Sequence, residues 1–357
     1  MDSPKQLAEI LFHKLGLPIL KRKKTGPSTD VEVLEKLAAR EDLPVGTQKV
    51  PAMLLEYRQF SKLCNTYLDN LRECQDKRDG RIHASFMQLG AATGRLSSAS
   101  PNLQNIPVRS EAGRQIRKAF IPDPGNKFIV ADYSQIELRI LAHLSQDPAL
   151  IEAFNNDQDI HAAVASQVFN TPLEEVTQEQ RAQAKVINFG IVYGITSYGL
   201  AKRIDNLDEP QARALIKDYR KRFAGIDKFL SKCVQQALDL GYVTTILGRR
   251  RPIAQIHSSN GNTRSLGERL AINTVVQGSA TGDLIKKAMV NLYNRIESEK
   301  LPLQMICQIH DELIFESPEA DVDAMKEIVR QEMESAIKLT VPLKVDIGIG
   351  DDWLEAK

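Results

Sequence analysis

Helical spacing of apolar residues dominates this chain, and strand-like spacing appears at only a few places. Residues 4–15, the segment VEVLEKLAAR after Asp30, and the stretch from about 52 to 73 have helical spacing. Asp30 is a residue type that can cap the second of these helices. Residues 148–300 are also mostly helical by spacing, with interruptions at Gly and Pro and at GRRRP (248–252). The pattern predicts a helical first section of about 80 residues and a long helical insertion later.

Apolar runs of strand length are widely separated along the chain. They are 81–87, which alternates, 127–132, which ends on an acid, 304–316, which holds two runs around a tight polar turn, and 341–349. A helix is predicted at about 319–337, and the Ser/Asn/Pro-rich stretch 97–107 is typical of an extended loop. Because the four strand segments could share one sheet, we predict an α+β fold with a central sheet and two helical lobes.

Composition excludes several classes of protein. Of the 357 residues, 42% are hydrophobic and 26% are charged, which is ordinary for a soluble globular protein with a substantial core. No apolar run approaches the roughly 20 residues needed to cross a bilayer, and the first residues lack the layout of a targeting peptide. The four cysteines form no CxxC pair, so neither a zinc site nor a disulfide framework is predicted, and a reducing cytosol is favoured.

Several basic and polar stretches could bind nucleic acid, for which the net charge of +1 is no obstacle because only a local basic surface is needed. Basic clusters at 21–24 and 249–251 are each more typical of a solvated surface than of a phosphate contact. The stretch TGRLSSASPNLQNIP (93–107) is rich in hydrogen-bonding side chains, namely Arg95, Asn102, Gln104 and Asn105. Such residues could contact sugar, phosphate and minor-groove edges, although a polar loop with Asx turns has the same composition.

Asp132 and Asp311 each lie at the end of an apolar strand segment, where an unpaired carboxylate is costly to bury. Brought together, two such carboxylates could hold two magnesium ions about 4 Å apart for in-line phosphoryl transfer. Each could instead cap the following helix or turn. The two lie too far apart in the chain for any spacing rule to link them.

One helix combines cationic and aromatic side chains. In QRAQAKVINFGIVYG four of them recur every four positions: Arg181, Lys185, Phe189 and Tyr193. The resulting stripe drifts by only about 40° per step along about 18 Å of helix. Its cationic end suits phosphates and its aromatic end suits a base. A helix with an aromatic core contact and a charged outer end is the alternative, but Gly190 and Gly194 argue against it because they indicate close approach of another group.

In combination, these motifs resemble the bacterial DNA polymerase I family (family A DNA polymerases) through essentially the whole chain. DYSQIELR (132–139) is similar to motif A, RAQAKVINFGIVYG (181–194) to motif B and IHDE (309–312) to motif C. Further matches in the family's order are TGRLSSASPNLQNIP, DIH (159–161), GRRRP, ERLAINTVVQG (268–278) and the ending DIGIGDDWLEAK.

The resemblance implies a right-hand polymerase fold with a central antiparallel palm sheet, helical fingers and a truncated helical thumb. The partial thumb would be 1–80, the palm 81–147 and 301–357, and the fingers 148–300. The first part of the thumb would be missing, and the roughly 80 residues before the polymerase motifs would house neither a proofreading exonuclease nor a 5′ nuclease.

The resemblance also implies the catalytic groups. Asp132 and Asp311 would ligate two Mg²⁺ ions, for which Mn²⁺ could substitute, with the Tyr133 carbonyl as a further ligand. Lys185 would donate a proton to the departing pyrophosphate, and Glu312 would be a secondary acid.

The substrates implied by the resemblance are deoxynucleoside triphosphates and primer–template DNA. The residues holding the triphosphate would be Gln135, His161, Arg181 and Lys185. Phe189 would stack near the base and sugar, Tyr193 would sit at the templating position, and Glu137 would be the steric gate against a ribose 2′-hydroxyl. The residues contacting primer–template would be Arg95, Asn102, Asn105, Arg269, Asn273, Gln277 and His310.

The implied biology is a cytoplasmic, nucleoid-associated monomer of replication or repair without a membrane partner. In the family the helix with Arg181 and Lys185 swings inward on a matching nucleotide. A phage-type RNA polymerase is a second enzyme interpretation, against which Glu137 argues. A non-catalytic DNA-binding fragment is the alternative from another class.

Two local departures from the family pattern bear on the site. FMQLGAATGRLSS carries Met87, Leu89 and Gly90 where polar groups are expected near the primer, which could weaken the grip on DNA. The spacing from Gln277 to Asp283 is one residue longer than the family's Q-G-T/S-A-A-D. A local bulge at Gly282 is therefore expected in that helix.

Overall fold

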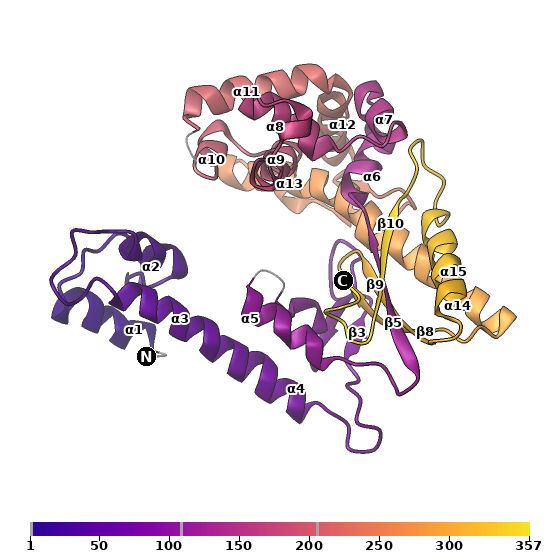
Figure 1. The fold of residues 1–357 in the computed structure, drawn as a ribbon. Coiled ribbons are helices and arrows are strands. Elements are labelled where there is room, and N and C mark those ends of the chain that lie inside the picture. The colour runs from indigo at the N-terminus through magenta and orange to yellow at the C-terminus, as the bar shows by residue number, and fades with distance from the viewer. Residues whose placement is uncertain (1–2, 108–109, 205–206) are drawn as a thin grey trace. The chain divides into compact units, whose positions relative to one another are not determined.

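The computed structural model describes residues 3–107, 110–204 and 207–357, which form two groups of packed elements (Figure 1). Unit 1 comprises Met1–Ala84 and Ile106–Ile116, and unit 2 comprises Ser85–Asn105 and Arg117–Lys357. Each unit has its own hydrophobic core. Among the described residues there is no helix with the length and apolar character that crossing a bilayer requires.

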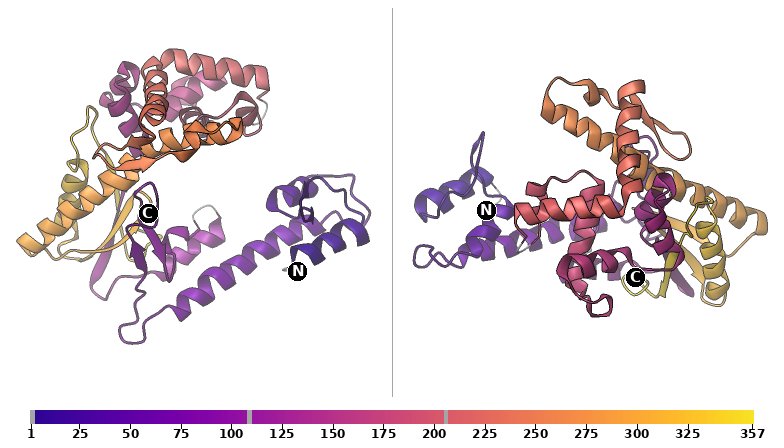
Figure 2. Two further views of the ribbon diagram at one scale, coloured as in Figure 1. Left: turned by 180° about the vertical axis from the view of Figure 1, so that it is seen from behind. Right: turned by 90° about the horizontal axis from the view of Figure 1, so that it is seen from above.

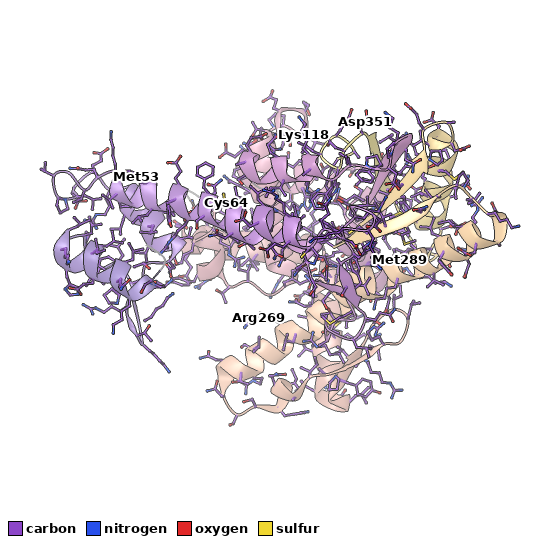
Figure 3. The ribbon with its side chains drawn as sticks, turned by 90° about the horizontal axis from the view of Figure 1, so that it is seen from below. Met53, Cys64, Lys118, Arg269, Met289 and Asp351 are labelled. Atoms are coloured by element: carbon purple, nitrogen blue, oxygen red, sulfur yellow. The ribbon has the colours of Figure 1, made fainter. Side chains whose placement is uncertain are left out.

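Unit 1 is helical, as its sequence spacing predicts. Its elements are α1 (Pro4–Ala8), η1 (Glu9–Lys14), β1 (Arg22–Lys23), β2 (Gly26–Pro27), α2 (Val31–Ala38), α3 (Val50–Lys62), η2 (Leu63–Leu68), α4 (Asp69–Glu73) and α5 (Glu111–Arg114). The Asp30 carboxylate accepts a hydrogen bond from the Val33 amide at 3.1 Å and caps α2, as predicted. The segments α3, η2 and α4 follow without a break, which confirms the long helix expected there; Met53 and Cys64 lie on it (Figure 3).

A four-stranded antiparallel sheet is the centre of unit 2. Its strands, in spatial order, are β10 (Val345–Gly350), β5 (Asn126–Tyr133), β9 (Glu312–Pro318) and β8 (Gln304–Ile309). The apolar runs at 127–132, 304–316 and 341–349 therefore share one sheet, as expected. α14 (Ile285–Glu299) and α15 (Val322–Glu334) pack against the sheet (Figures 1 and 2), and the fully buried Ile129, Phe315 and Leu292 belong to the shared core.

The strand expected at 81–87 is wrong in its length and in its sheet. Only β3 (Ser85–Met87) forms, and it pairs with β4 (Ser97–Ala99) in a separate two-stranded sheet. The physical reason is that no residue from 81 to 87 is buried, so this segment offers no apolar face to a central sheet. The extended loop expected at 97–107 is also wrong in part, since it contains β4 and the 3₁₀ turn η3 (Leu103–Asn105).

A helical lobe occupies the middle of the chain, which confirms the helical character expected for 148–300. It follows β5 and comprises α6 (Ile136–Ser145), α7 (Pro148–Asn155), α8 (Ile160–Phe169), η5 (Leu173–Glu175), α9 (Gln178–Val192), α10 (Ser197–Ala201), α11 (Glu209–Arg222), α12 (Ala224–Leu240), β6 (Tyr242–Thr244), β7 (Arg250–Pro252), η6 (Ala254–His257), α13 (Gly261–Gln277) and η7 (Gly278–Leu284). The 3₁₀ turn η4 (Gln115–Ala119) precedes β5. The GRRRP interruption contains β7, which pairs with β6 in a hairpin.

The helix after α13 has the irregularity that its spacing predicts. η7 is a π-helical turn that contains Gly282 and joins α13 to α14. A π-turn accommodates one extra residue without breaking the helix. The expectation of a local bulge is confirmed.

Candidate active site

Two acidic residues meet at one end of the central strands of the sheet. Asp132 is the next-to-last residue of β5, and Asp311 lies in the two-residue turn between β8 and β9. Asp132 faces Glu312 across the β5–β9 ladder, and the Tyr133 amide donates a hydrogen bond to the Asp311 carbonyl oxygen at 3.2 Å. Opposed residues of an antiparallel ladder have Cβ atoms about 5 Å apart. The ladder therefore places Asp132 beside Glu312, and the Tyr133 bond brings the turn with Asp311 next to them.

The surroundings of these two acids favour a bound cation. Burial, followed by the nearby Asp132 carboxylate, raises the pKa of the Asp311 carboxyl from 3.8 to about 6. The Asp132 Oδ1 atom is buried and has no hydrogen-bond partner in the part of the chain that the structure describes. A divalent cation would offset the repulsion and contact that oxygen, and oxygen atoms are the ligands that Mg²⁺ prefers. The residues present therefore fit a magnesium site.

Around the acids lie three residues that were not predicted from the sequence. The Lys357 ammonium lies 3.4 Å from Asp132 Oδ2 and forms an ion pair with Glu312 Oε2. Glu312 is 1% exposed, and its Oε1 atom accepts a hydrogen bond from the Trp353 indole at 3.1 Å. The Arg117 guanidinium lies over the Trp353 ring, 4.1 Å from its centroid. Glu312 is thus engaged by the last residues of the chain, and the single tryptophan was the signal that could have pointed to this cluster.

Tyr133 and Gln135 connect β5 to α6 beside the acids. The Tyr133 ring is buried and its hydroxyl donates to the Met333 carbonyl at 2.7 Å, so its side chain does not enter the site. Gln135 occupies the N-cap position of α6 with a left-handed φ of 51° and makes no capping hydrogen bond with its side chain. Its buried Oε1 atom has no hydrogen-bond partner among the described residues.

Glu137, in the first turn of α6, is held by side chains from two other segments. Its carboxylate accepts hydrogen bonds from the Tyr193 hydroxyl and, at 3.3 Å, from the Arg95 guanidinium. The Phe189 and Tyr193 rings stack with centroids 6.1 Å apart and an interplanar angle of 14°. Glu137 also contributes to the raised pKa of Asp311, so it lies within electrostatic reach of the acid pair.

The residues expected in a stripe lie on α9 and its C-cap: Arg181, Lys185, Phe189 and Tyr193. Arg181 Nε donates to Asp159 Oδ2 at 2.5 Å, whereas Lys185 is exposed. His161 is 2% exposed, its Nδ1 atom lies 2.8 Å from the Asn188 amide nitrogen, and its ring centroid lies 5.7 Å from that of Phe189. Burial, reinforced by the cations of α9, lowers the pKa of His161 from 6.5 to about 4. Asn188 was missed by the sequence analysis.

One face of α13 carries the polar residues expected to contact DNA. Arg269, Asn273 and Gln277 follow one another at intervals of four, so they share a side of the helix. Arg269 is exposed (Figure 3), and Gln277 hydrogen-bonds the Tyr193 side chain. The Asn273 Oδ1 atom is buried without a hydrogen-bond partner within the described ranges.

The polar stretch 93–107 is tied to the turn that carries Asp311. Gln104 Nε2 donates to Gln308 Oε1 at 3.0 Å, and Gln308 Nε2 donates to the His310 carbonyl at 2.5 Å. The side chain of Asn102 is exposed and accepts from the Gln104 amide at 3.1 Å, which is the Asx turn weighed as the alternative. Asn105 ends η3 and is exposed.

The residues that depart from the family pattern near Arg95 are apolar and exposed. Leu89 is 95% exposed and Met87 is 49% exposed. Gly90 faces Ser97, whose Oγ would lie 2.4 Å from a Cβ added at this position. Rotation of the Ser97 hydroxyl would relieve this contact, so the position does not require glycine.

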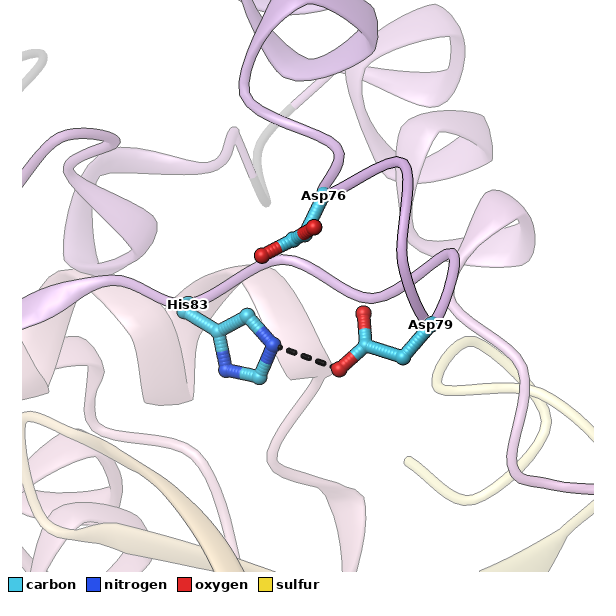
Figure 4. Close-up of side chains that lie close together, drawn as sticks. All are labelled: Asp76, Asp79 and His83. Atoms are coloured by element: carbon cyan, nitrogen blue, oxygen red, sulfur yellow. Dashed lines mark hydrogen bonds and ion pairs between the residues drawn. The ribbon is translucent and has the colours of Figure 1, made fainter.

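Unit 1 contains one group of three potential metal ligands, Asp76, Asp79 and His83, whose ligand atoms lie within 4.8 Å of one another (Figure 4). Asp76 accepts a hydrogen bond from the Arg78 guanidinium at 2.6 Å. Asp79 contacts His83 Nε2 at 2.9 Å and accepts from the Arg81 amide at 2.9 Å. These contacts within the turn account for the cluster without an ion.

Comparison with known proteins gives one consistent family. A family model described as DNA polymerase family A matches residues 1–355. The chain is 46% identical over 357 residues to the DNA polymerase I of Caldicellulosiruptor bescii and 47% identical over 358 residues to that of Bacillus subtilis. These matches cover all of this chain but 41% and 40% of the relatives, so the chain spans about two fifths of their length.

A solved structure supports the same fold. It is described as the POL domain of Pol1 from M. smegmatis in complex with DNA primer–template and dNTP, and it is 43% identical to this chain with a TM-score of 0.91. The match covers 99% of this chain and 61% of the other. The predicted α+β fold, with an antiparallel sheet and helical lobes, is therefore confirmed as that of a polymerase domain.

Proposed function

Because this chain belongs to DNA polymerase family A, we propose that it adds deoxynucleotides to the 3′ end of a DNA primer under the direction of a template strand. The observation that carries this proposal is the acid pair of Asp132 and Asp311 beside Glu137, which in turn contacts the aromatic end of α9. Phosphoryl transfer needs such a combination of metal ligands, phosphate-binding cations and a stacking surface.

Asp132 and Asp311 would hold two Mg²⁺ ions, or Mn²⁺ in their place, with the Tyr133 carbonyl as a further ligand. Bound there, the ions supply Lewis-acid stabilisation of the charge that develops at the transferred phosphate. The raised pKa of Asp311 and the unpaired Asp132 oxygen support this assignment, since both indicate a place for positive charge. We assign Glu312 a supporting part only, because Trp353 and Lys357 already engage both of its oxygens.

The α9 side chains would bind the triphosphate. Arg181 would exchange Asp159 for phosphate oxygens, and exposed Lys185 would contact the phosphates and protonate the leaving pyrophosphate. His161 and Gln135 would complete the phosphate contacts by donating from a ring N–H and from the side-chain NH₂ group. The buried, unpaired Oε1 atom of Gln135 is an acceptor and would need a donor other than the phosphates.

The other end of the site would select the nucleotide. Phe189 would lie near the base and sugar, and Tyr193 at the templating position. Glu137 would block a ribose 2′-hydroxyl, and its two hydrogen bonds support a fixed position for this carboxylate.

Primer–template would lie against α13 and the stretch 93–107. The proposed contacts are Arg95, Asn102, Asn105, Arg269, Asn273, Gln277 and His310. Donors of this kind can sense the geometry of a base pair through minor-groove acceptors without reading its sequence. Exposed Leu89 and Met87 would present apolar surface beside Arg95, which supports a weakened grip on DNA.

In these terms we assign residues 81–147 and 301–357 to a palm, 148–300 to fingers and 1–80 to part of a thumb.

We further propose that the chain acts as a monomer and has neither proofreading nor 5′ nuclease activity. Incubation with a 3′- or 5′-labelled primer and Mg²⁺, without nucleotides, checks the latter: shortening of the labelled strand would contradict it.

Primer extension with Mg²⁺ tests the proposed activity. We expect Asp132→Asn and Asp311→Asn to lower extension by roughly 100-fold or more while DNA binding persists, because the charge that holds the ions is lost. Asp218→Asn is the matched control, since Asp218 is an exposed aspartate on α11 that the proposed site does not include. Wild-type binding of DNA without extension would favour a non-catalytic DNA-binding module. Full activity of Asp132→Asn would reject the site.

A further inference from the structure

The π-turn η7 brings an additional hydroxyl group to the site. The spacing from Gln277 to Asp283 contains one residue more than the family pattern, and η7 accommodates it. Within this turn Thr281 is buried, and its side-chain oxygen both donates to the Gln277 carbonyl at 3.0 Å and accepts a hydrogen bond from Arg95 Nε. The turn thus contacts a residue almost two hundred positions earlier in the chain.

Close backbone approach fixes the position of η7 against the segment that carries Arg95. A Cβ added to Gly282 would lie 2.6 Å from the Thr93 carbonyl oxygen, and one added to Gly278 would lie 3.2 Å from the same atom. Only glycine permits this approach without a shift of the backbone. Asp283 anchors the end of the turn by accepting a hydrogen bond from the Leu247 amide at 3.1 Å. Thr281 is therefore presented to Arg95 from a rigid element.

Arg95 passes this restraint on to Glu137. With Nε bonded to Thr281, the guanidinium of Arg95 keeps Nη2 3.3 Å from Glu137 Oε1. The second carboxylate oxygen of Glu137 accepts from the Tyr193 hydroxyl. An arginine bonded at Nε loses rotational freedom in its planar group, so the direction of its remaining donors is fixed. One continuous chain of hydrogen bonds runs from η7 to the end of α9.

We propose that Thr281 is a positioning residue that holds Arg95 in place and, through it, orients Glu137 for discrimination between deoxyribose and ribose. The proposal rests on the proposed function, in which Glu137 faces the sugar of the incoming nucleotide. The hydrogen bonds of the Thr281 hydroxyl go to the Gln277 carbonyl and to Arg95 Nε. The hydroxyl determines how firmly the carboxylate is held.

Thr281→Val removes the hydroxyl and keeps the shape of the side chain. We expect it to lower the discrimination between a deoxynucleotide and its ribonucleotide by about tenfold, the size expected for one hydrogen bond to a charged group. The change should appear as a lower KM for the ribonucleotide, with kcat for the deoxynucleotide little altered. Thr281→Ser, which keeps the hydroxyl, should restore wild-type discrimination.

Ser279→Ala is the matched control from the same turn. Ser279 is buried and its hydroxyl bonds the Ile246 amide at 2.9 Å, so its loss should lower the melting temperature without changing sugar discrimination. A double-mutant cycle with Arg95→Ala adds a readout that a merely structural role would not move. If Thr281 acts through Arg95, Thr281→Val has no further effect on discrimination in the Arg95→Ala background.

The outcomes separate this inference from the proposed function. Absence of extension by the wild type, or unchanged discrimination in Glu137→Ala, would remove the function on which the inference rests. The inference alone would be overturned if Glu137→Ala changed the discrimination between deoxynucleotide and ribonucleotide while Thr281→Val left it at the wild-type value. It would also be overturned if the effects of Thr281→Val and Arg95→Ala on this discrimination were additive in the double mutant.

Discussion

His161 should make the stability of the protein sensitive to acid, and the structure gives the size of the effect. The side chain is 2% exposed, and its Nδ1 atom faces the Asn188 amide nitrogen at 2.8 Å, an arrangement in which Nδ1 accepts and the ring is neutral. Burial and the cations of α9 lower its pKa from 6.5 to about 4. The perturbation that isolates this group is His161→Gln, which removes the titrating ring and keeps a polar side chain.

The sign of the effect follows from proton binding in the two states. Between pH 6.5 and about 4 the unfolded chain protonates this histidine and the folded chain does not, so acidification favours unfolding. The stability contributed by neutral His161 is complete above pH 6.5 and is lost as the pH falls through that window. At about 1.36 kcal/mol per pKa unit, the fall from 6.5 to about 4 corresponds to about 3 kcal/mol.

Urea unfolding at pH 7.5 and pH 4, followed by circular dichroism, measures this difference. Groups other than His161 titrate in both proteins and cancel when the variant is subtracted from the wild type. We expect the wild type to lose about 3 kcal/mol more than His161→Gln on acidification. His13→Gln, which replaces an exposed imidazole, should behave as the wild type. Equal losses in wild type and His161→Gln, or an NMR titration of the His161 ring with a midpoint near 6.5, would refute the reasoning.

Three further predictions test the site. Lys357→Ala removes the ammonium that pairs with Asp132 and Glu312, so the metal-free protein should melt at a lower temperature in chelator and bind Mn²⁺ severalfold more tightly by electron paramagnetic resonance; unchanged Mn²⁺ affinity would show that the lysine does not compete with the ion. Glu137→Ala should lower discrimination against ribonucleotides in steady-state incorporation assays, and an unchanged ratio rejects its assignment as a steric gate. Phe189→Tyr should raise dideoxynucleotide incorporation in competition with deoxynucleotides, because the Phe189 ring offers no hydrogen-bond partner to a sugar that lacks its 3′-hydroxyl; no change in that competition would contradict the place given to Phe189.

Local features of the site were readable from residue order. The apolar run that ends at Asp132 became β5, and the four-residue spacing of Arg181 to Tyr193 became one face of α9. The extra residue before Asp283 became the π-turn η7. The strand and the stripe depend on the period of a strand or helix and on a few neighbouring residues, so the pattern within a short window is sufficient. The extra residue is visible only against the family's Q-G-T/S-A-A-D spacing.

Partners that are distant in sequence were not readable in this way. Periodicity could not show that β5 would pair with β9 and β10, that 81–87 would leave the sheet, or that Trp353 and Lys357 would engage Glu312. Nor could it show that Thr281 would meet Arg95. Strand pairing and side-chain contacts across such separations depend on how all the buried surfaces of a unit pack at once, and a short window of sequence contains only one side of each contact.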